Sequence, residues 1–385
     1  MGRPRFAKWA ASIALLAVTT TCTPSSPPTG TGRCSGWKVT PSPNPVGQNL
    51  LFGVWAGNQD VWAVGATKPS GAQARTLIER WQGRRWELVS SPNAEGSDNY
   101  LEDVSGGKGD VWAVGQRVPT SAAGRTLVER WDGSAWSILP SPNVGRGVNA
   151  LTAVTEVSPS DVWVAGYYDR GRIHRSMVFR WNGARWLRQP LPRVRGAGDG
   201  INAIAAGPPG RVVAVGGSTT HWGAGRSMIL TFDGRRWRQQ SIVRPPQGSS
   251  LSGVAASPDG RAWAVGAFGG SRGDRAFAVS ARGASWSIVS HEPVGQVSED
   301  LNDVATDGGG RAWAVGSSFS GGLYRTFVER TEGGPWSHVE TPNLPHMDNR
   351  LLSVFALPGG GVWAAGTAWN GPAPARTLVL HRCPS

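Results

Sequence analysis

The 385-residue sequence lacks several patterns that define common protein classes. Its 54 glycines keep no three-residue period, which excludes collagen. It has few stretches free of glycine and proline, because 28 prolines add to those glycines, so long helices are not expected. Its hydrophobic content of 39% and its 20 tryptophans are too high for a disordered chain. What remains is a folded, turn-rich, all-β protein.

Charge is also scarce, and it is uneven in kind. Only 17% of the residues are charged, yet 39 basic residues against 26 acidic ones give a net charge of +13. Only four of the basic residues are lysine, so arginine carries nearly all of the positive charge. These charges are interleaved with Gly and Trp repeats rather than clustered, so no nucleic acid partner is expected.

Residues 1–21 have the layout of a secretory signal. Arg3, Arg5 and Lys8 form a basic start, and residues 9–18 form an apolar core of about ten residues. A permanent membrane helix needs roughly 20 apolar residues, so this core is too short to be one. We expect an exported protein.

Cys22 directly follows this leader and precedes a Pro/Ser/Thr/Gly tether at residues 23–33. The position resembles the lipidation cysteine of bacterial lipoproteins. The match departs from the usual pattern because residues 19–21 are all threonine, where Leu, a small residue and Gly or Ala are typical. Two alternatives therefore remain, a cell-surface protein lipidated at Cys22 and a cleaved, extracellular protein. A lipid anchor is the only membrane contact we expect.

An internal repeat of about 50 residues dominates the rest of the chain. The phrase Val-Trp-Ala-Val-Gly occurs at residues 61–65 and 111–115, and variants of it follow. An apolar residue opens each of seven units: Leu51, Leu101, Leu151, Ile201, Leu251, Leu301 and Leu351. The second position of the phrase is tryptophan in six units: Trp62, Trp112, Trp163, Trp263, Trp313 and Trp363.

Each unit predicts four short strands, represented by residues 51–54, 61–65, 125–131 and a last strand that begins at Trp86 or its equivalents. Trp131-Asp132-Gly133 is a tight hairpin turn between the third and fourth strands. The second strand is apolar at successive positions, so both of its faces must be covered. Seven such units predict a seven-bladed β-propeller of four-stranded antiparallel blades, with the repeated tryptophans packed between blades.

The ends of the chain predict how this ring closes. The last unit lacks its fourth strand, and residues 36–44 match residues 85–93, which contain a fourth strand. The N-terminal segment should therefore complete the last blade, which makes residues 34–385 a single domain. By the same alignment Cys34 and Cys383 fall at consecutive positions of the missing turn, so we expect a disulfide between them.

These residues resemble the repeats of kelch-type and related bacterial secreted propellers. The shared features are an aromatic-containing strand that ends in glycine, as at residues 162–166, and Trp131-Asp132-Gly133 before Trp136. The chain departs from kelch repeats in mostly having one glycine after the second strand rather than two. The resemblance implies the propeller architecture and carries no activity.

A binding site is expected on the propeller face with the longer, more variable connections, such as residues 66–74 and 167–174. Aromatic and arginine side chains on these connections suit sugar stacking or an anionic polymer. The tentative ligand-binding residues are Arg117, Tyr167, Tyr168, Arg170, Arg172, Trp222, Arg272, Tyr324 and Trp369.

One arginine opens the third strand in every unit: Arg75, Arg125, Arg175, Arg226, Arg275, Arg325 and Arg376. A cationic ring for an acidic ligand is one interpretation. Repetition in every blade favours a structural role, in which these arginines satisfy loop carbonyls or a carboxylate such as Glu79 or Glu129.

The sequence contains no clear catalytic motif. Its six histidines lack metal-site spacing, and we see no nucleophile elbow or phosphate loop, so no metal and no cofactor are expected. Residues 257–263 resemble a sialidase Asp-box turn only once and are one residue short. The favoured hypothesis is a monomeric, non-enzymatic scaffold that binds a protein or other ligand. The alternatives are a glycan-binding, lectin-like module and a glycoside hydrolase such as a sialidase-like enzyme.

Overall fold

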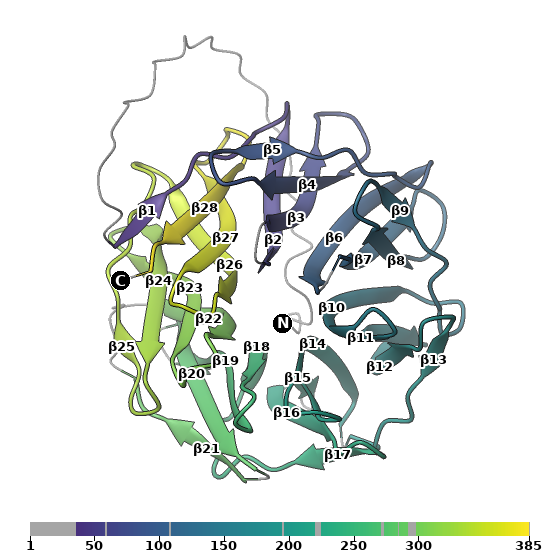
Figure 1. Ribbon diagram of the computed structural model, residues 1–385, viewed down its shortest axis with the longest axis vertical. Coiled ribbons are helices and arrows are strands. Elements are labelled where there is room, and N and C mark those ends of the chain that lie inside the picture. Colours follow the sequence, from purple (N-terminus) through teal and green to yellow (C-terminus); the bar gives the residue numbers. More distant parts are fainter. Residues whose placement is uncertain are drawn as a thin grey trace.

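The computed structural model describes residues 36–384 except 58–59, 108, 195, 220–224, 271–272, 284 and 292–297. These residues form seven four-stranded antiparallel sheets arranged as blades around a central axis (Figure 1). The all-β, seven-bladed propeller predicted by the repeat is therefore confirmed.

Blades 1 to 4 follow one another along the chain. Blade 1 contains β2 (Gln48–Ala56), β3 (Val61–Lys68), β4 (Arg75–Trp81) and β5 (Trp86–Leu88). Blade 2 contains β6 (Ser97–Gly106), β7 (Val111–Pro119), β8 (Arg125–Trp131) and β9 (Trp136–Ile138). Blade 3 contains β10 (Asn149–Ser158), β11 (Asp161–Arg170), β12 (Ile173–Trp181) and β13 (Trp186–Arg188). Blade 4 contains β14 (Gly198–Ala206), β15 (Val212–Thr219), β16 (Gly225–Phe232) and β17 (Trp237–Gln240).

Blades 5 to 7 complete the ring. Blade 5 contains β18 (Ser249–Ala256), β19 (Arg261–Gly270), β20 (Gly273–Arg282) and β21 (Ser285–Val289). Blade 6 contains β22 (Ser298–Thr306), β23 (Ala312–Ser320), β24 (Leu323–Thr331) and β25 (Ser337–His338). Blade 7 contains β26 (Asp348–Ala356), β27 (Val362–Trp369), β28 (Arg376–Arg382) and β1 (Trp37–Val39).

The first two strands of each blade meet at a bulge that explains the repeated glycine. In blade 1 the pairing of β2 with β3 shifts register between Leu51 and Gly53. A Cβ on Gly65 would lie 1.9 Å from the Leu50 carbonyl oxygen, so only glycine permits this approach. The innermost strand continues on both sides of the bulge. β2 therefore spans Gln48–Ala56 rather than the predicted residues 51–54.

The repeated tryptophans pack between blades, as the sequence predicts. Trp62 is 1% exposed, and its ring centroid lies 5.4 Å from that of Trp136 on the fourth strand of blade 2. Trp112 meets Trp186 of blade 3 in the same way at 5.9 Å. Each of these second-strand tryptophans therefore contacts the outer strand of the following blade. There it excludes water from the interface between the two blades, which we call the seam.

A repeated ion pair covers these tryptophans in the first three blades. Arg80 Nη2 lies 2.7 Å from Asp60 Oδ2, and the Arg80 guanidinium carbon lies 5.0 Å from the centroid of Trp62. The same arrangement joins residues of blades 2 and 3, with ion-pair distances of 2.7 Å: Asp110, Arg130 and Trp112, and Asp161, Arg180 and Trp163. The carboxylate neutralises a guanidinium that packs on the indole.

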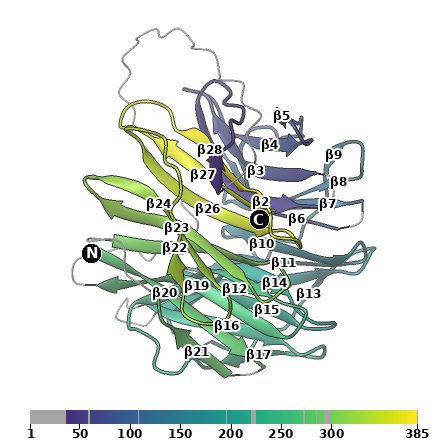
Figure 2. The same ribbon diagram turned by 60° about the vertical axis from the view of Figure 1, so that its left-hand side comes forward.

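The N-terminal strand completes the seventh blade, as predicted (Figures 1 and 2). Trp37 of β1 pairs with Arg382 of β28, and its ring centroid lies 5.8 Å from that of Trp313 of blade 6. Trp86 of blade 1 makes the equivalent contact with Trp363 of blade 7. The Asn44 side-chain oxygen then accepts the Thr377 N–H at 2.9 Å. Blades 1, 2 and 6 contain the same Asn clamp on their own third strands.

Cys22 and Cys34 lie outside the described residues, so lipidation and the Cys34–Cys383 disulfide stay predictions. The described partner, Cys383, directly follows β28, and β1 begins three residues after Cys34. Trp37 pairs with Arg382, so the described strand β1 lies beside β28 one residue before Cys383.

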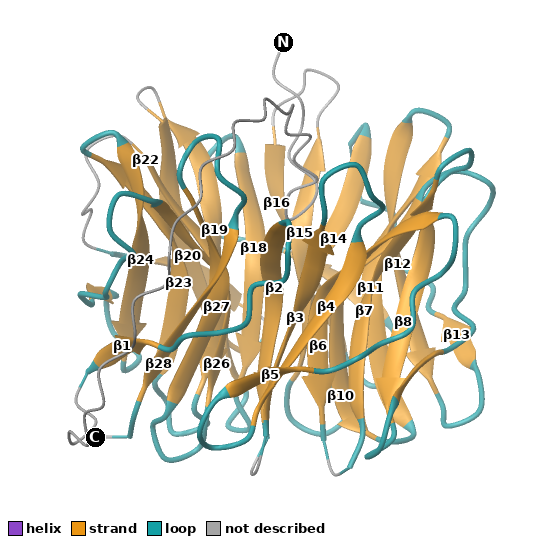
Figure 3. Cartoon of the chain, turned by 90° about the horizontal axis from the view of Figure 1, so that it is seen from above, coloured by secondary structure: helices purple, strands orange, loops and turns teal. Residues whose placement is uncertain are grey.

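The strands run between two faces that contain the connections (Figure 3). We call one of them the hairpin face, which contains the connections between the second and third strands of each blade and the connections between blades. The turn face contains the connections between the first and second strands and between the third and fourth strands. The tentative binding residues that the structure describes belong to the hairpin face.

Candidate functional site

The expected long connections on the hairpin face are mostly strand, which corrects the sequence analysis. Residues 167–174 were expected to form a loop, but β11 continues to Arg170 and β12 begins at Ile173. Residues 66–68 likewise belong to β3. Because backbone pairing holds these segments, their side chains are placed by the sheets rather than by loops.

The structure places the tentative binding residues in several separate environments. Arg117, Arg170 and Arg172 are exposed at the ends of hairpins. Tyr167 is buried at 9% exposure, whereas its neighbour Tyr168 packs with the seam of blades 2 and 3 and lies under the Arg188 guanidinium at 5.4 Å. Trp222 and Arg272 lie outside the described residues.

Tyr324 and Trp369 do come together, around an arginine that the sequence analysis did not select. The Arg350 guanidinium carbon lies 3.7 Å from the Tyr324 ring centroid and 5.2 Å from that of Trp369. Phe319 extends the group, with its ring 5.0 Å from Tyr324. The Asp348 carboxylate accepts the Tyr324 N–H at 2.7 Å and fixes the start of this hairpin. We call Phe319, Tyr324, Arg350 and Trp369 the aromatic–arginine array.

A signal for Arg350 was present in the repeat. The equivalent positions at the start of the other innermost strands are Leu50, Tyr100, Ala150, Gly200, Ser250 and Asp300. A long cation therefore breaks the repeat there, beside the two aromatic residues that the sequence did indicate. The guanidinium contacts both rings, and Tyr324 and Trp369, both half-buried, keep part of their surface for contact with a ligand.

A second polar group lies on the hairpin face of blades 2 and 3. His174 Nδ1 lies 2.5 Å from Asp169 Oδ1, and the His174 ring lies 4.9 Å from that of Tyr167. Burial raises the pKa of Tyr167 to about 12, and the charges of Glu102 and Asp169 act in the same direction. Tyr167 is therefore a protonated hydrogen-bond donor at neutral pH.

The arginines that open the third strands do not all have the role that the sequence suggested. Arg125 Nη1 donates to the carbonyls of Gly145 and Gly147 at 3.4 Å, and Arg175 Nη1 lies 2.8 Å from Asp199 Oδ2. Within the described part of the chain, four others make no ion pair: Arg75, Arg226, Arg325 and Arg376.

Glu79 and Glu129 are not the partners of these arginines, which corrects the sequence analysis. Both are 0% exposed, and neither has a hydrogen bond to its carboxyl oxygens among the described residues. Burial raises the pKa of each to about 8, and a nearby serine, Ser42 or Ser91, opposes this only in part. The Ser42 hydroxyl donates to Thr377 instead, at 2.7 Å.

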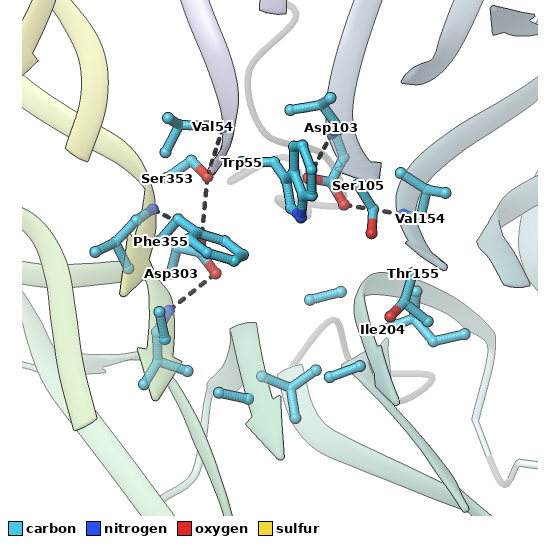
Figure 4. A pocket seen from close by; sticks show the side chains of 18 of the residues that line it. Val54, Trp55, Asp103, Ser105, Val154, Thr155, Ile204, Asp303, Ser353 and Phe355 are labelled. Carbon is cyan, nitrogen blue, oxygen red and sulfur yellow. Dashed lines mark hydrogen bonds between the residues drawn. The ribbon is translucent and has the colours of Figure 1, made fainter. Parts of the chain in front are cut away.

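The central channel opens on the turn face as a cavity of about 210 Å³ (Figure 4). One side is aromatic, with the Trp55 and Phe355 ring centroids 6.1 Å apart. The equivalent residues of the other blades are small: Ser105, Thr155, Ala205, Ala255 and Ala305. Asp103 and Asp303 line the cavity, where each accepts an N–H from the next blade, at 2.9 Å from Val154 and 3.0 Å from Val354. These carboxylates therefore hold neighbouring blades together.

Two features are absent from the described residues. No helix among them is long and apolar enough to cross a membrane. Within the same residues, no group of three or more His, Cys, Asp or Glu side chains could hold a metal ion.

Comparison with known proteins extends the description of the fold. No family model matches the sequence, and no curated protein matches it. A solved structure described as YCF48 bound to D1 peptide is similar, with a TM-score of 0.56 and 15% identity over 92% of this chain and 100% of that one.

Two similar structures come from a polysaccharide lyase, the PL25 ulvan lyase. One has a TM-score of 0.55 and 9% identity over 85% of this chain and 90% of that one. The other, bound to -[GlcA(1-4)Rha3S]-, has a TM-score of 0.56 and 9% identity over 90% of this chain and 95% of that one. At such low identity these likenesses show the propeller fold alone, and that fold supports binding proteins as well as enzymes.

Proposed function

We propose that this protein is an exported, non-enzymatic scaffold that binds an acidic partner on its hairpin face. The partner is an extended acidic segment of a protein. The observation that carries the proposal is the aromatic–arginine array of blades 6 and 7, which lies beside two arginines without ion pairs, Arg325 and Arg376.

Charge supports an acidic partner. Besides the four unpaired strand-opening arginines, Arg117, Arg170 and Arg172 are exposed on this face and have no ion pair among the described residues. Seven cations without carboxylates on one face raise the local concentration of anions and steer an acidic ligand toward it. Their guanidinium groups match carboxylates in two-point contacts.

Rigidity supports a binding role for these hairpins. Phe319 and Tyr324 belong to paired strands, β23 and β24, and Trp369 ends β27, which pairs with both β26 and β28. A partner that docks on this array meets side chains that are already ordered, so little conformational entropy is lost on binding. The similar propeller bound to D1 peptide is a precedent for a peptide partner on this architecture.

A second candidate function, an anionic glycan-binding module, is supported by the rings of the array. Tyr324 and Trp369 lie 6.4 Å apart and are tilted by 37°, so adjacent sugar rings could pack on them while arginines contact acid groups. The bound -[GlcA(1-4)Rha3S]- of the similar lyase is an anionic glycan on this architecture. The third reading, a sialidase-like hydrolase, stays a prediction.

Binding to immobilised poly-glutamate and to a glycan array tests both candidates. We expect wild type to bind poly-glutamate in a salt-dependent manner, and the double variant Arg325→Gln/Arg376→Gln to bind at least tenfold more weakly. The control is Arg235→Gln/Arg236→Gln, which removes the same charge from an exposed turn of the turn face.

The glycan candidate needs a different variant. Trp369→Ala should abolish binding to acidic glycans if the rings hold sugars, while poly-glutamate binding should fall only slightly. Equal losses in the hairpin-face and turn-face double variants would contradict both candidates, since net charge alone would then account for binding.

A further inference from the structure

The seam between blades 6 and 7 departs from the ion-pair pattern of blades 1 to 3. In those blades an aspartate just before the second strand neutralises an arginine of the third strand, as Asp60 does for Arg80. In blade 6 the equivalent positions are Arg311 and Arg330, and the equivalent tryptophan is Trp313. An arginine thus occupies the position at which blades 1 to 3 have the aspartate.

A third arginine joins this group from blade 7. The Arg382 guanidinium carbon lies 5.1 Å from the Trp313 ring centroid, and that of Arg330 lies 5.6 Å from the same centroid. Figures 1 and 2 show β24 of blade 6 beside blade 7, which contains β28. Two guanidinium groups therefore share one indole, whereas among the described residues Trp112 of blade 2 has that of Arg130 alone.

Protein carboxylates neutralise this group only in part. Arg311 Nε lies 2.6 Å from Asp307 Oδ2, and Arg330 pairs with Glu332. Arg382 makes no ion pair with any described residue, and its Nη1 donates only a long bond of 3.4 Å to the Gly360 carbonyl. Burial lowers the pKa of Arg382, and the charges of Arg330 and Arg311 add to this effect. Among the described residues, one positive charge of this group has no carboxylate partner.

All three arginines are partly exposed. The turn at residues 359–361 consists of glycines, and Arg311 Nη2 would lie 3.6 Å from a Cβ on Gly360. Gly361 occupies the position of Asp60 in blade 7, so that turn offers Arg382 no carboxylate. The side chains of Arg311 and Arg330 are 37% and 34% exposed.

We propose that Arg311, Arg330 and Arg382 form a binding site for a phosphate group on the turn face. Guanidinium groups donate paired, charge-assisted hydrogen bonds to tetrahedral oxyanions, and an anion would compensate the charge that Asp307 and Glu332 leave. The site is separate from the acidic-partner surface, which lies on the opposite face, so either proposal can fail without the other.

Isothermal titration of the full chain tests the site, with inorganic phosphate and glycerol phosphate as separate probes at constant ionic strength. We expect wild type to bind at least one of them with 1:1 stoichiometry. Arg382→Gln should weaken binding about tenfold or more, because it removes charged hydrogen bonds. Arg130→Gln is the matched control, since Arg130 packs on Trp112 in the same way but has Asp110 as its partner.

The two probes distinguish free phosphate from a phosphate ester as the natural source, and binding of either supports the site. Arg330→Gln provides an independent variant if Arg382→Gln does not fold, as judged by its thermal unfolding. The proposal is overturned if wild type binds neither probe, if both site variants bind within twofold of wild type, or if Arg130→Gln loses as much affinity as they do.

Discussion

Replacing Glu79 by glutamine should change how the stability of the propeller depends on pH. Glu79 is fully buried between blades 7 and 1, and burial raises its pKa from 4.5 to about 8. Between these values the folded protein keeps a proton that the unfolded chain releases. Stability therefore falls as pH rises through this window, by about 1.4 kcal/mol per pH unit for one such group.

The magnitude follows from this slope. From pH 5.5 to 7.5, Glu79 should lower the free energy of unfolding by roughly 2 to 3 kcal/mol, and Glu129, whose pKa is also raised to about 8, by a similar amount. Glu79→Gln has nearly the same shape without the proton, so it should remove one of these two contributions. At pH 5.5, one unit above the pKa of the unfolded chain, the variant should already exceed wild type by about 1.4 kcal/mol.

Urea unfolding followed by tryptophan fluorescence at pH 5.5, 6.5 and 7.5 measures this effect. The control is Glu95→Gln, because Glu95 is exposed on the hairpin face. The stability excess of the variant over wild type should grow by about 2 to 3 kcal/mol between pH 5.5 and 7.5, to about 4 kcal/mol, and the control should follow wild type. Parallel pH profiles for Glu79→Gln and wild type would refute the assignment of a buried, protonated carboxyl group.

Three further predictions concern the scaffold. Trp112→Ala should lower the free energy of unfolding by about 3 to 5 kcal/mol, because it empties a fully buried seam; a loss below 1 kcal/mol in urea unfolding would be inconsistent with that packing. Gly65→Ala should prevent a cooperative thermal transition, whereas Gly269→Ala, with nothing within 4 Å of its Cβ, should unfold like wild type; equal behaviour would argue against the bulge geometry. Non-reducing peptide mapping of the exported protein should recover Cys34 joined to Cys383, and a free Cys34 would disprove the covalent closure.

The architecture could be predicted because the repeat encodes it at many positions at once. Seven openings such as Leu51, six seam tryptophans such as Trp62 and the match of residues 36–44 to 85–93 all indicate the same ring. The structure confirms each of these, including the contact of Trp37 with Trp313 that closes the last seam. The residues that pack between similar units recur at fixed positions in the sequence, so this packing can be recognised there.

The candidate site was harder to predict because it depends on departures from the repeat. Residues 167–174 look like a variable loop, yet Tyr167 pairs across the sheet with Ser176, and such pairing adds no repeated sequence signal. Glu79 resembles a surface carboxylate near Arg75, but strand alternation turns it into the seam. Arg350 is distant in sequence from Tyr324 and meets it only because blades 6 and 7 are neighbours.

Hydroxyl-radical footprinting of the protein with saturating poly-glutamate tests the proposed acidic-partner surface most directly. The account predicts protection of residues 319–325 and 369–376 on the hairpin face, with the turn-face residues 233–236 labelled as in the free protein. Protection confined to the turn face, or no protection at residues 319–325 and 369–376 under saturating ligand, would contradict it.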